Sequence, residues 1–195
     1  MIDIEAPPVR RFPTLTVATP RLQLRPLDVA DAPAVDTILA DRLTRRWLAP
    51  PDHTGRLDGL AWCTELAKRP RDRGDGDHYA VERREDGRMV GLLWTARTDW
   101  TVRTTEVSCL VAPGARGYGV AAEAVDALGL ALLLEHGFER VELRVAPGNT
   151  ASRRVAEKAG FVYEGLLRNA GYVHGGRVDL EVWSLVAGDL RQGSG

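Results

Sequence analysis

Seven short stretches of the chain carry the alternation of polar and apolar residues, or the short apolar run, that is typical of β-strands. The alternation is clearest at residues 140–145, where every second residue is Val or Leu. Asp86-Gly87 lies between two of the stretches and is a typical hairpin turn. The expected strands are residues 21–27, 78–84, 89–98, 104–111, 140–145, 162–167 and 178–185.

Four other segments carry apolar residues at helical spacing. Asp28 offers an N-terminal cap to the first helix, and Gly137 and Gly160 are stop signals for the third and fourth. The polar, glycine-rich residues 69–77 predict an exposed loop. The expected helices are residues 28–40, 57–68, 120–136 and 150–159.

The order of these elements predicts one α+β domain with a mixed, mostly antiparallel sheet of about seven strands. Three strands follow one another without an intervening helix between residues 78 and 111, so a doubly wound sheet is excluded. A chain of 195 residues suits one domain with short extensions. We expect a flexible arm at residues 1–14, the domain at 15–187 and a flexible tail at 188–195.

Charge and composition exclude several classes of function. The 26 basic and 27 acidic residues are mixed and give a net charge of −1, which predicts no nucleic-acid or membrane surface. No signal peptide is visible and the longest apolar stretch, residues 128–134, is too short to cross a bilayer, so we expect a cytoplasmic protein. The four histidines show no metal-ligand spacing, so no metal is expected. Cys63 and Cys109 are expected to be free thiols, the second a buried thiol rather than a nucleophile.

The turn between the fourth strand and the third helix, residues 116–121, has the features of a phosphate site. Its glycines allow the backbone to approach an anion, and the first N–H groups of the helix have no internal partner. The dinucleotide fingerprint requires a third glycine where Ala122 stands, and the nucleotide-triphosphatase loop requires a lysine where Val120 stands. A plain strand-to-helix turn remains an alternative.

Two signatures resemble the GNAT acetyltransferases. Arg116-x-x-Gly119-x-Ala121 is similar to the loop of that family whose backbone binds the pyrophosphate of coenzyme A. Residues 149–161, which begin with Asn149-x-x-Ser152, and the stretch Glu164-Gly165-Leu166-Leu167-Arg168 resemble the RimJ/RimL branch. The resemblance covers about residues 15–185 and is specific over 105–168.

The resemblance implies a GNAT fold and an acyl-CoA co-substrate. It implies that the backbone near Leu110 and Val111 serves the pantetheine arm and the thioester, because the family's strands splay there. The loop residues that it implies for the pyrophosphate are Arg116, which adds a positive charge, Gly117, Tyr118, Gly119, Val120 and Ala121.

Acyl transfer to an amine requires a base for the amine, a donor for the carbonyl oxygen and a proton for the thiolate. Glu106 matches the glutamate of RimJ/RimL-like sequences and is the expected base, with a strand-edge charge as the alternative. Asn149 is expected to bind the pantetheine arm or a water, or only to cap a helix. Ser152 is expected near the sulfur, or is an ordinary first-turn serine; the tyrosine that many GNAT enzymes use as the acid is replaced by Ala156.

The acceptor is left open by the sequence. The resemblance favours a protein N-terminal α-amine; a small amine (polyamine, amino acid or antibiotic) and a non-catalytic CoA-binding sensor are the alternatives. Trp47, Trp94 and Trp100 either border the acceptor cleft or belong to the core. The acyl group could be acetyl or a carboxylated chain such as succinyl, and a homodimer is possible.

Overall fold

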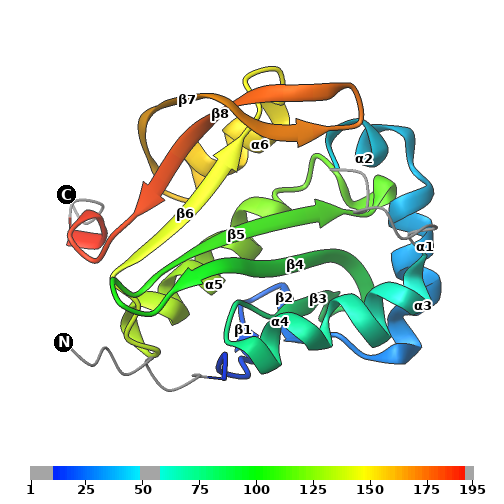
Figure 1. The fold of residues 1–195 in the computed structure, drawn as a ribbon. Helices are drawn as coiled ribbons and strands as arrows, with labels where there is room; N and C mark the ends of the chain where they lie inside the picture. Colours follow the sequence, from blue (N-terminus) through cyan, green and yellow to red (C-terminus); the bar gives the residue numbers. More distant parts are fainter. Residues whose placement is uncertain (1–10, 49–57, 192–195) are drawn as a thin grey trace, which may run out of the picture.

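Eight strands form one mixed sheet in the computed structural model, which describes residues 11–48 and 58–191 (Figure 1). The strand order is β1-β2-β3-β4-β5-β6-β8-β7, and only β5 and β6 pair in parallel. The strands are β1 (Val17–Ala18), β2 (Leu22–Pro26), β3 (His78–Arg83), β4 (Arg88–Asp99), β5 (Thr104–Val111), β6 (Arg140–Val145), β7 (Val162–Val173) and β8 (Gly176–Leu185). The predicted α+β class is therefore confirmed. The strand beyond the expected seven is β1, whose two residues are too short to show an alternation.

Helices cover the sheet on both faces. The longer ones are α1 (Ala32–Ala40), α5 (Val120–Leu134) and α6 (Thr150–Lys158). The shorter ones are η1 (Val29–Asp31), α2 (Arg42–Trp47), α3 (Gly59–Ala61), η2 (Trp62–Leu66), α4 (Lys68–Arg73), η3 (Pro113–Ala115) and η4 (Asp189–Arg191). No helix in the described part of the chain is both long and apolar enough to span a membrane.

Two hydrophobic clusters divide the two faces of the sheet between them. The main cluster packs α5 and the end of α6 on one face and includes Val107 of β5 and Val141 of β6. The second cluster packs α1 and η2 on the opposite face of β4, around Leu92. In Figure 1, α5 and α6 lie behind the sheet, whereas α3 and α4 lie in front of β2 and β3. Side chains alternate along a strand, so the residues that follow Val107 and Val141 by one position turn away from α5.

The prediction for residues 57–77 was wrong in two respects. The helix continues through Arg73 instead of giving way to a loop, and Asp77 is completely buried and paired with Arg71 at 2.7 Å. The middle of this helix is the π-helix η2, which shifts the helical register, so Trp62 is buried while Leu66 is exposed. Leu57, where the helix was expected to begin, lies outside the described residues.

The edges of the folded body also differ from expectation. Phe12, within the expected arm, is 2% exposed and packs against Trp100 and Phe138. The first ten residues of that arm lie outside the described range. Helix α2 was not expected; its N-terminal cap is Asp41, whose carboxylate accepts a hydrogen bond from the Thr44 N–H at 2.9 Å.

Candidate active site

The parallel strands β5 and β6 pair over only three residues and then separate. The pairs are Thr104 with Arg140, Thr105 with Val141 and Glu106 with Glu142. Beyond this point residues 107–111 of β5 pair with β4 alone. Their backbone groups on the β6 side are therefore unpaired in the sheet, and Leu110 and Val111 lie in this segment.

Glu106 is the last residue of β5 that still pairs with β6. Its side chain is 15% exposed. Its Oε2 atom lies 3.1 Å from Arg97 Nη1 and 3.3 Å from Arg144 Nε. Among the described residues, none donates a hydrogen bond to its Oε1 atom. Burial raises the pKa of the Glu106 carboxyl, and Arg97 and Arg144 oppose that rise. The carboxylate is thus held by one oxygen, while the other lacks a partner.

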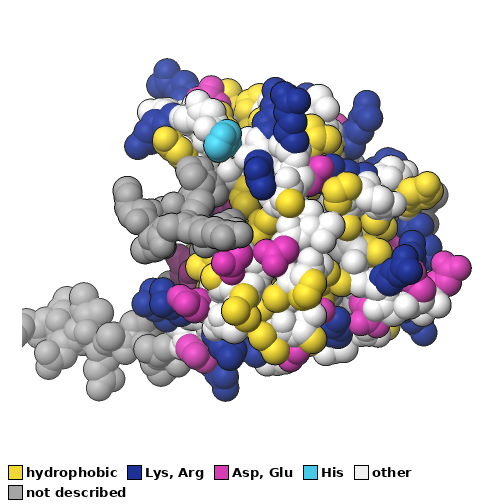
Figure 2. Space-filling model, turned by 90° about the vertical axis from the view of Figure 1, so that its right-hand side faces the viewer, with side chains coloured by type: hydrophobic (Ala, Val, Ile, Leu, Met, Phe, Trp, Pro, Cys, Tyr) yellow, Lys and Arg dark blue, Asp and Glu magenta, His cyan; other side chains and the backbone are white. Residues whose placement is uncertain are grey.

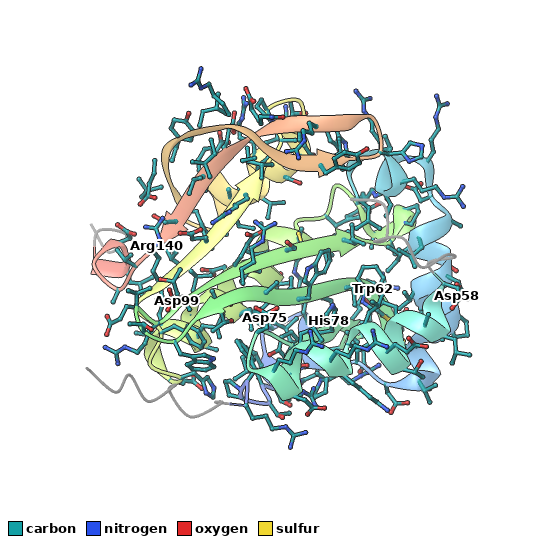
Figure 3. All side chains as sticks on the ribbon, viewed as in Figure 1. Asp58, Trp62, Asp75, His78, Asp99 and Arg140 are labelled. Carbon is teal, nitrogen blue, oxygen red and sulfur yellow. The ribbon has the colours of Figure 1, made fainter. Side chains whose placement is uncertain are left out.

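A row of alternating charges continues from Glu106 across the same face of the sheet. Glu142 accepts from Arg144 at 3.2 Å and from Arg140 at 2.8 Å. Arg140 also pairs with Glu164. Figure 3 shows Arg140 at the start of β6, near the end of β4. Each carboxylate in this row has at least one guanidinium partner, so the face around Glu106 is close to electrically neutral.

The loop before α5 has the backbone of an anion site. Gly117 and Gly119 take φ values of +86° and +78°, in the left-handed region that favours glycine. Gly119 is the N-terminal cap of α5 and provides no side chain to occupy the first N–H groups of the helix. Tyr118 between them is 71% exposed. The N–H groups that follow at Val120 and Ala121 belong to the unpaired first turn.

Arg116 does not lie free beside this loop. Its guanidinium contacts the Asp41 carboxylate at 2.6 Å, the Thr44 hydroxyl at 3.1 Å and the Val111 carbonyl at 3.2 Å. The hydrogen bond from Arg116 holds the pKa of Asp41 down at about 2. The positive charge of Arg116, which was expected to lie beside the pyrophosphate, is therefore balanced by the carboxylate of Asp41. Asp41 is the N-terminal cap of α2, a helix that the sequence did not predict.

Asn149 and Ser152 lie at the start of α6, after β6 has left β5. The Asn149 Oδ1 atom accepts a hydrogen bond from the Ser152 N–H at 3.2 Å, so the expected helix cap is present. Within the described residues the Ser152 hydroxyl has no hydrogen-bond partner. Ala156, where many GNAT enzymes have tyrosine, is fully buried in the main cluster.

Residues 21–162 match the family model described as an acetyltransferase (GNAT) domain. The chain belongs to the GNAT acetyltransferase family. It is therefore an acyl-CoA-dependent N-acetyltransferase, and the predicted family and fold are confirmed.

The relatives of this GNAT chain include protein and small-molecule acetyltransferases. A candidate ribosomal N-acetyltransferase, YdaF of Bacillus subtilis, is 33% identical over 52% of the chain and 55% of its own length. L-2,4-diaminobutyric acid acetyltransferase of Streptomyces avermitilis is 31% identical over 66% of the chain and 64% of its own length. The structure of Mycobacterium smegmatis RimJ with a CoA disulfide is 25% identical and covers 91% of the chain and 90% of RimJ, with a TM-score of 0.78. The likeness to YdaF and RimJ supports the RimJ/RimL-like branch that the sequence predicted.

Three aromatic residues of this GNAT domain contact one another on the same face of the sheet as Glu106. Trp94 on β4 lies opposite Ser108 of β5, stacks on His78 at 6.1 Å and meets Trp62 edge-on at 5.6 Å. Figure 3 shows Trp62 and His78 side by side on this face. Trp94 is only partly buried. Trp100 is also partly buried, but it packs against the main cluster and donates to the Gly74 carbonyl at 2.7 Å.

Burial perturbs both cysteine thiols of the domain. Burial raises the pKa of the Cys63 thiol to about 11 and that of the Cys109 thiol to about 12. His53 lies outside the described residues. Within the described residues, no group of three or more His, Cys, Asp or Glu side chains could hold a metal ion.

Proposed function

We propose that this enzyme transfers the acetyl group of acetyl-CoA directly to the N-terminal α-amine of a protein, with Glu106 as the base. The observation that carries the proposal is the neutral face around Glu106, where each carboxylate has a guanidinium partner. A polycationic amine is favoured by unpaired negative charge, whereas a peptide N-terminus needs a neutral cleft with apolar walls. The partly buried Trp94 supports such a wall.

The co-substrate fits the two features that flank this face. The loop amides from Gly117 to Ala121 would hold the pyrophosphate, since the left-handed glycines and the helix start favour an anion. The pantetheine arm would lie in the gap between β5 and β6, against the unpaired backbone near Leu110 and Val111. Asn149 would face the same gap from the start of α6. In RimJ, which shares this branch, the bound molecule is a CoA disulfide.

The reaction then follows from the positions of these groups. The amine lone pair forms the C–N bond, a backbone N–H of β5 stabilises the oxyanion, and the C–S bond breaks. The Oε1 atom of Glu106 takes the amine proton, directly or through water. The thiolate leaves as an anion or takes a proton from Ser152 or from solvent. An α-amine, with an ordinary pKa of about 7.7–8.0, needs much less help from a base than a lysine amine, at about 10.4.

One specific observation favours a second acceptor class. The Arg97 side chain beside Glu106 is 57% exposed and could bind the carboxylate of an amino-acid acceptor. The relative that acts on L-2,4-diaminobutyric acid is consistent with such a substrate. The homodimer also remains a proposal, supported by the exposed Tyr163 and Tyr172 on the edge strand β7.

The experiment is an intact-mass assay of acetyl transfer from acetyl-CoA. The acceptors are short peptides that begin with Ala or Ser, the same peptides with blocked α-amines, L-2,4-diaminobutyrate and spermidine. We expect labelling of the unblocked peptides alone. Glu106→Gln should reduce turnover by about 10²–10⁴-fold. Glu164→Gln, which removes a carboxylate that pairs with Arg140 and accepts from the Ser184 hydroxyl, should leave turnover within about threefold because Glu164 does not contact Glu106. Labelling confined to diaminobutyrate or spermidine would transfer the function to small amines.

A further inference from the structure

Arg97 has an unusual backbone for its residue type. It is one of three described non-glycine residues with positive φ, at +53°. It lies at an irregularity of β4, where the pairing with β5 shifts between Ala96 and Asp99. Non-glycine residues in this region are strained, and such strain persists where the surrounding structure requires it.

The bulge places the Arg97 guanidinium over the carboxylate of Glu106. The Nη1 atom lies 3.1 Å from Oε2, and among the described residues Glu106 is the carboxylate with which Arg97 pairs. Arg144 contacts the same oxygen from β6, but it also pairs with Glu142. Two guanidiniums on one oxygen fix the carboxyl plane and leave Oε1 as the atom that can accept a proton.

We propose that Arg97 is a positioning residue for the base: it holds Oε2 of Glu106 so that Oε1 faces the acceptor amine. This inference rests on the proposed role of Glu106. The charged groups that face Glu106 are Arg97 from β4 and Arg144 and Glu142 from β6. Arg97 opposes the effect of burial on the Glu106 pKa, so its removal must raise that pKa further.

The chain contains a matched control for both the backbone and the ion pair. Arg103 also has a φ of +53°, and its guanidinium pairs with Glu139. Both members of that pair are at least half exposed, and neither contacts Glu106. Arg97→Gln and Arg103→Gln therefore remove the same charge from the same backbone conformation, and they differ in whether the base loses its partner.

The test is the pH dependence of kcat at saturating acetyl-CoA and peptide acceptor, which reports ionisations in the bound complex and not that of the free peptide amine, for the wild type, Arg97→Gln, Arg97→Lys and Arg103→Gln. We expect the acidic limb of Arg97→Gln to move to higher pH, with a loss of activity at acidic pH about threefold to tenfold greater than the loss at the plateau. Arg97→Lys should restore the limb in part, and Arg103→Gln should follow the wild type. A profile of Arg97→Gln with an unshifted limb would overturn the inference.

Glu106→Gln separates this outcome from failure of the proposed function. If Glu106→Gln keeps wild-type turnover and the acidic limb, the base is another group and both proposals fail. If Glu106→Gln abolishes turnover while Arg97→Gln leaves the limb in place, Glu106 remains the base and only the role of Arg97 is refuted. A melting temperature for each variant distinguishes a shifted limb from partial unfolding at low pH.

Discussion

Gly117→Ala tests whether the loop before α5 depends on a left-handed backbone. Gly117 has a φ of +86°, and a Cβ added there would meet no atom within 4 Å. Gly114, three residues earlier, would also place its Cβ in open space, but its φ is outside the left-handed region. The two alanine variants therefore add the same methyl group without crowding and differ in backbone strain alone.

The expected magnitude follows from two opposing effects. A left-handed conformation costs a non-glycine residue about 1–2 kcal/mol, and alanine restores about 0.4–1 kcal/mol by restricting the unfolded chain. Gly117→Ala should lower the free energy of unfolding by about 1 kcal/mol and Gly114→Ala should raise it by about 0.5 kcal/mol. In a chain of this length the two melting temperatures should then differ by about 3–6 °C.

The assay is thermal unfolding with and without saturating acetyl-CoA. If the loop amides hold the pyrophosphate, Gly117→Ala should also weaken acetyl-CoA binding, because the ligand must return the loop to the left-handed conformation that alanine disfavours. Each 1.4 kcal/mol spent on that conformational change weakens binding by up to about tenfold. The acetyl-CoA affinity of Gly114→Ala should match the wild type. Equal melting temperatures for the two variants would refute the backbone argument, and wild-type affinity in a destabilised Gly117→Ala would place the pyrophosphate elsewhere.

Three further predictions concern stability and reactivity. Arg116→Ala should lower the free energy of unfolding in urea by about 1–2 kcal/mol, since it removes a charged hydrogen-bonded pair, whereas Arg83→Ala, in an exposed pair, should change it by less than about 0.5 kcal/mol. Burial lowers the pKa of His78 from 6.5 to about 4, so as the pH falls the unfolded state binds the proton before the folded state does. The free energy of unfolding should therefore fall by up to about 3 kcal/mol between pH 6.5 and pH 4. His78→Gln should flatten this dependence of stability on pH. Cys63 and Cys109 should resist a thiol reagent in the native protein, because burial raises both pKa values, and Cys109→Ser should keep turnover.

The sheet could be predicted because its strands carry local signals. The alternation at residues 140–145 gave β6 its correct bounds, and Gly160 marked the end of α6. The prediction failed between α3 and α4. Leu60 and Leu66 fit the buried face of a regular helix, whereas the π-helix η2 buries Trp62 and leaves both leucines exposed. In η2, Trp62 packs against Trp94 and His78. These contacts join residues far apart in the sequence, so the local hydrophobic pattern does not predict them.

The candidate site was predictable to the extent that backbone geometry defines it. The left-handed glycines of the loop were found from their letters and their place before a helix. The partners of Glu106 were not, because Arg97 and Arg144 reach it from two neighbouring strands and look like ordinary surface arginines in the sequence. The pairing of Arg116 with Asp41 was missed for the same reason, since 75 residues separate the two.

Helix α2 connects the two sides of the gap between β5 and β6. At its start, Asp41 is bound to Arg116, just beyond β5. At its end, Trp47 reaches the loop after β6, where a Cβ on Gly148 would lie 3.1 Å from the indole ring. Figure 2 looks onto this end of the molecule, where acidic side chains near the centre of the view are bordered by apolar ones. Only three residue pairs join β5 to β6, so α2 adds a second connection between the diverging strands. We therefore expect the width of the gap to depend on the cap at Asp41 as well as on the sheet, and Arg116, which the sequence predicts to lie beside the pyrophosphate, also binds that cap.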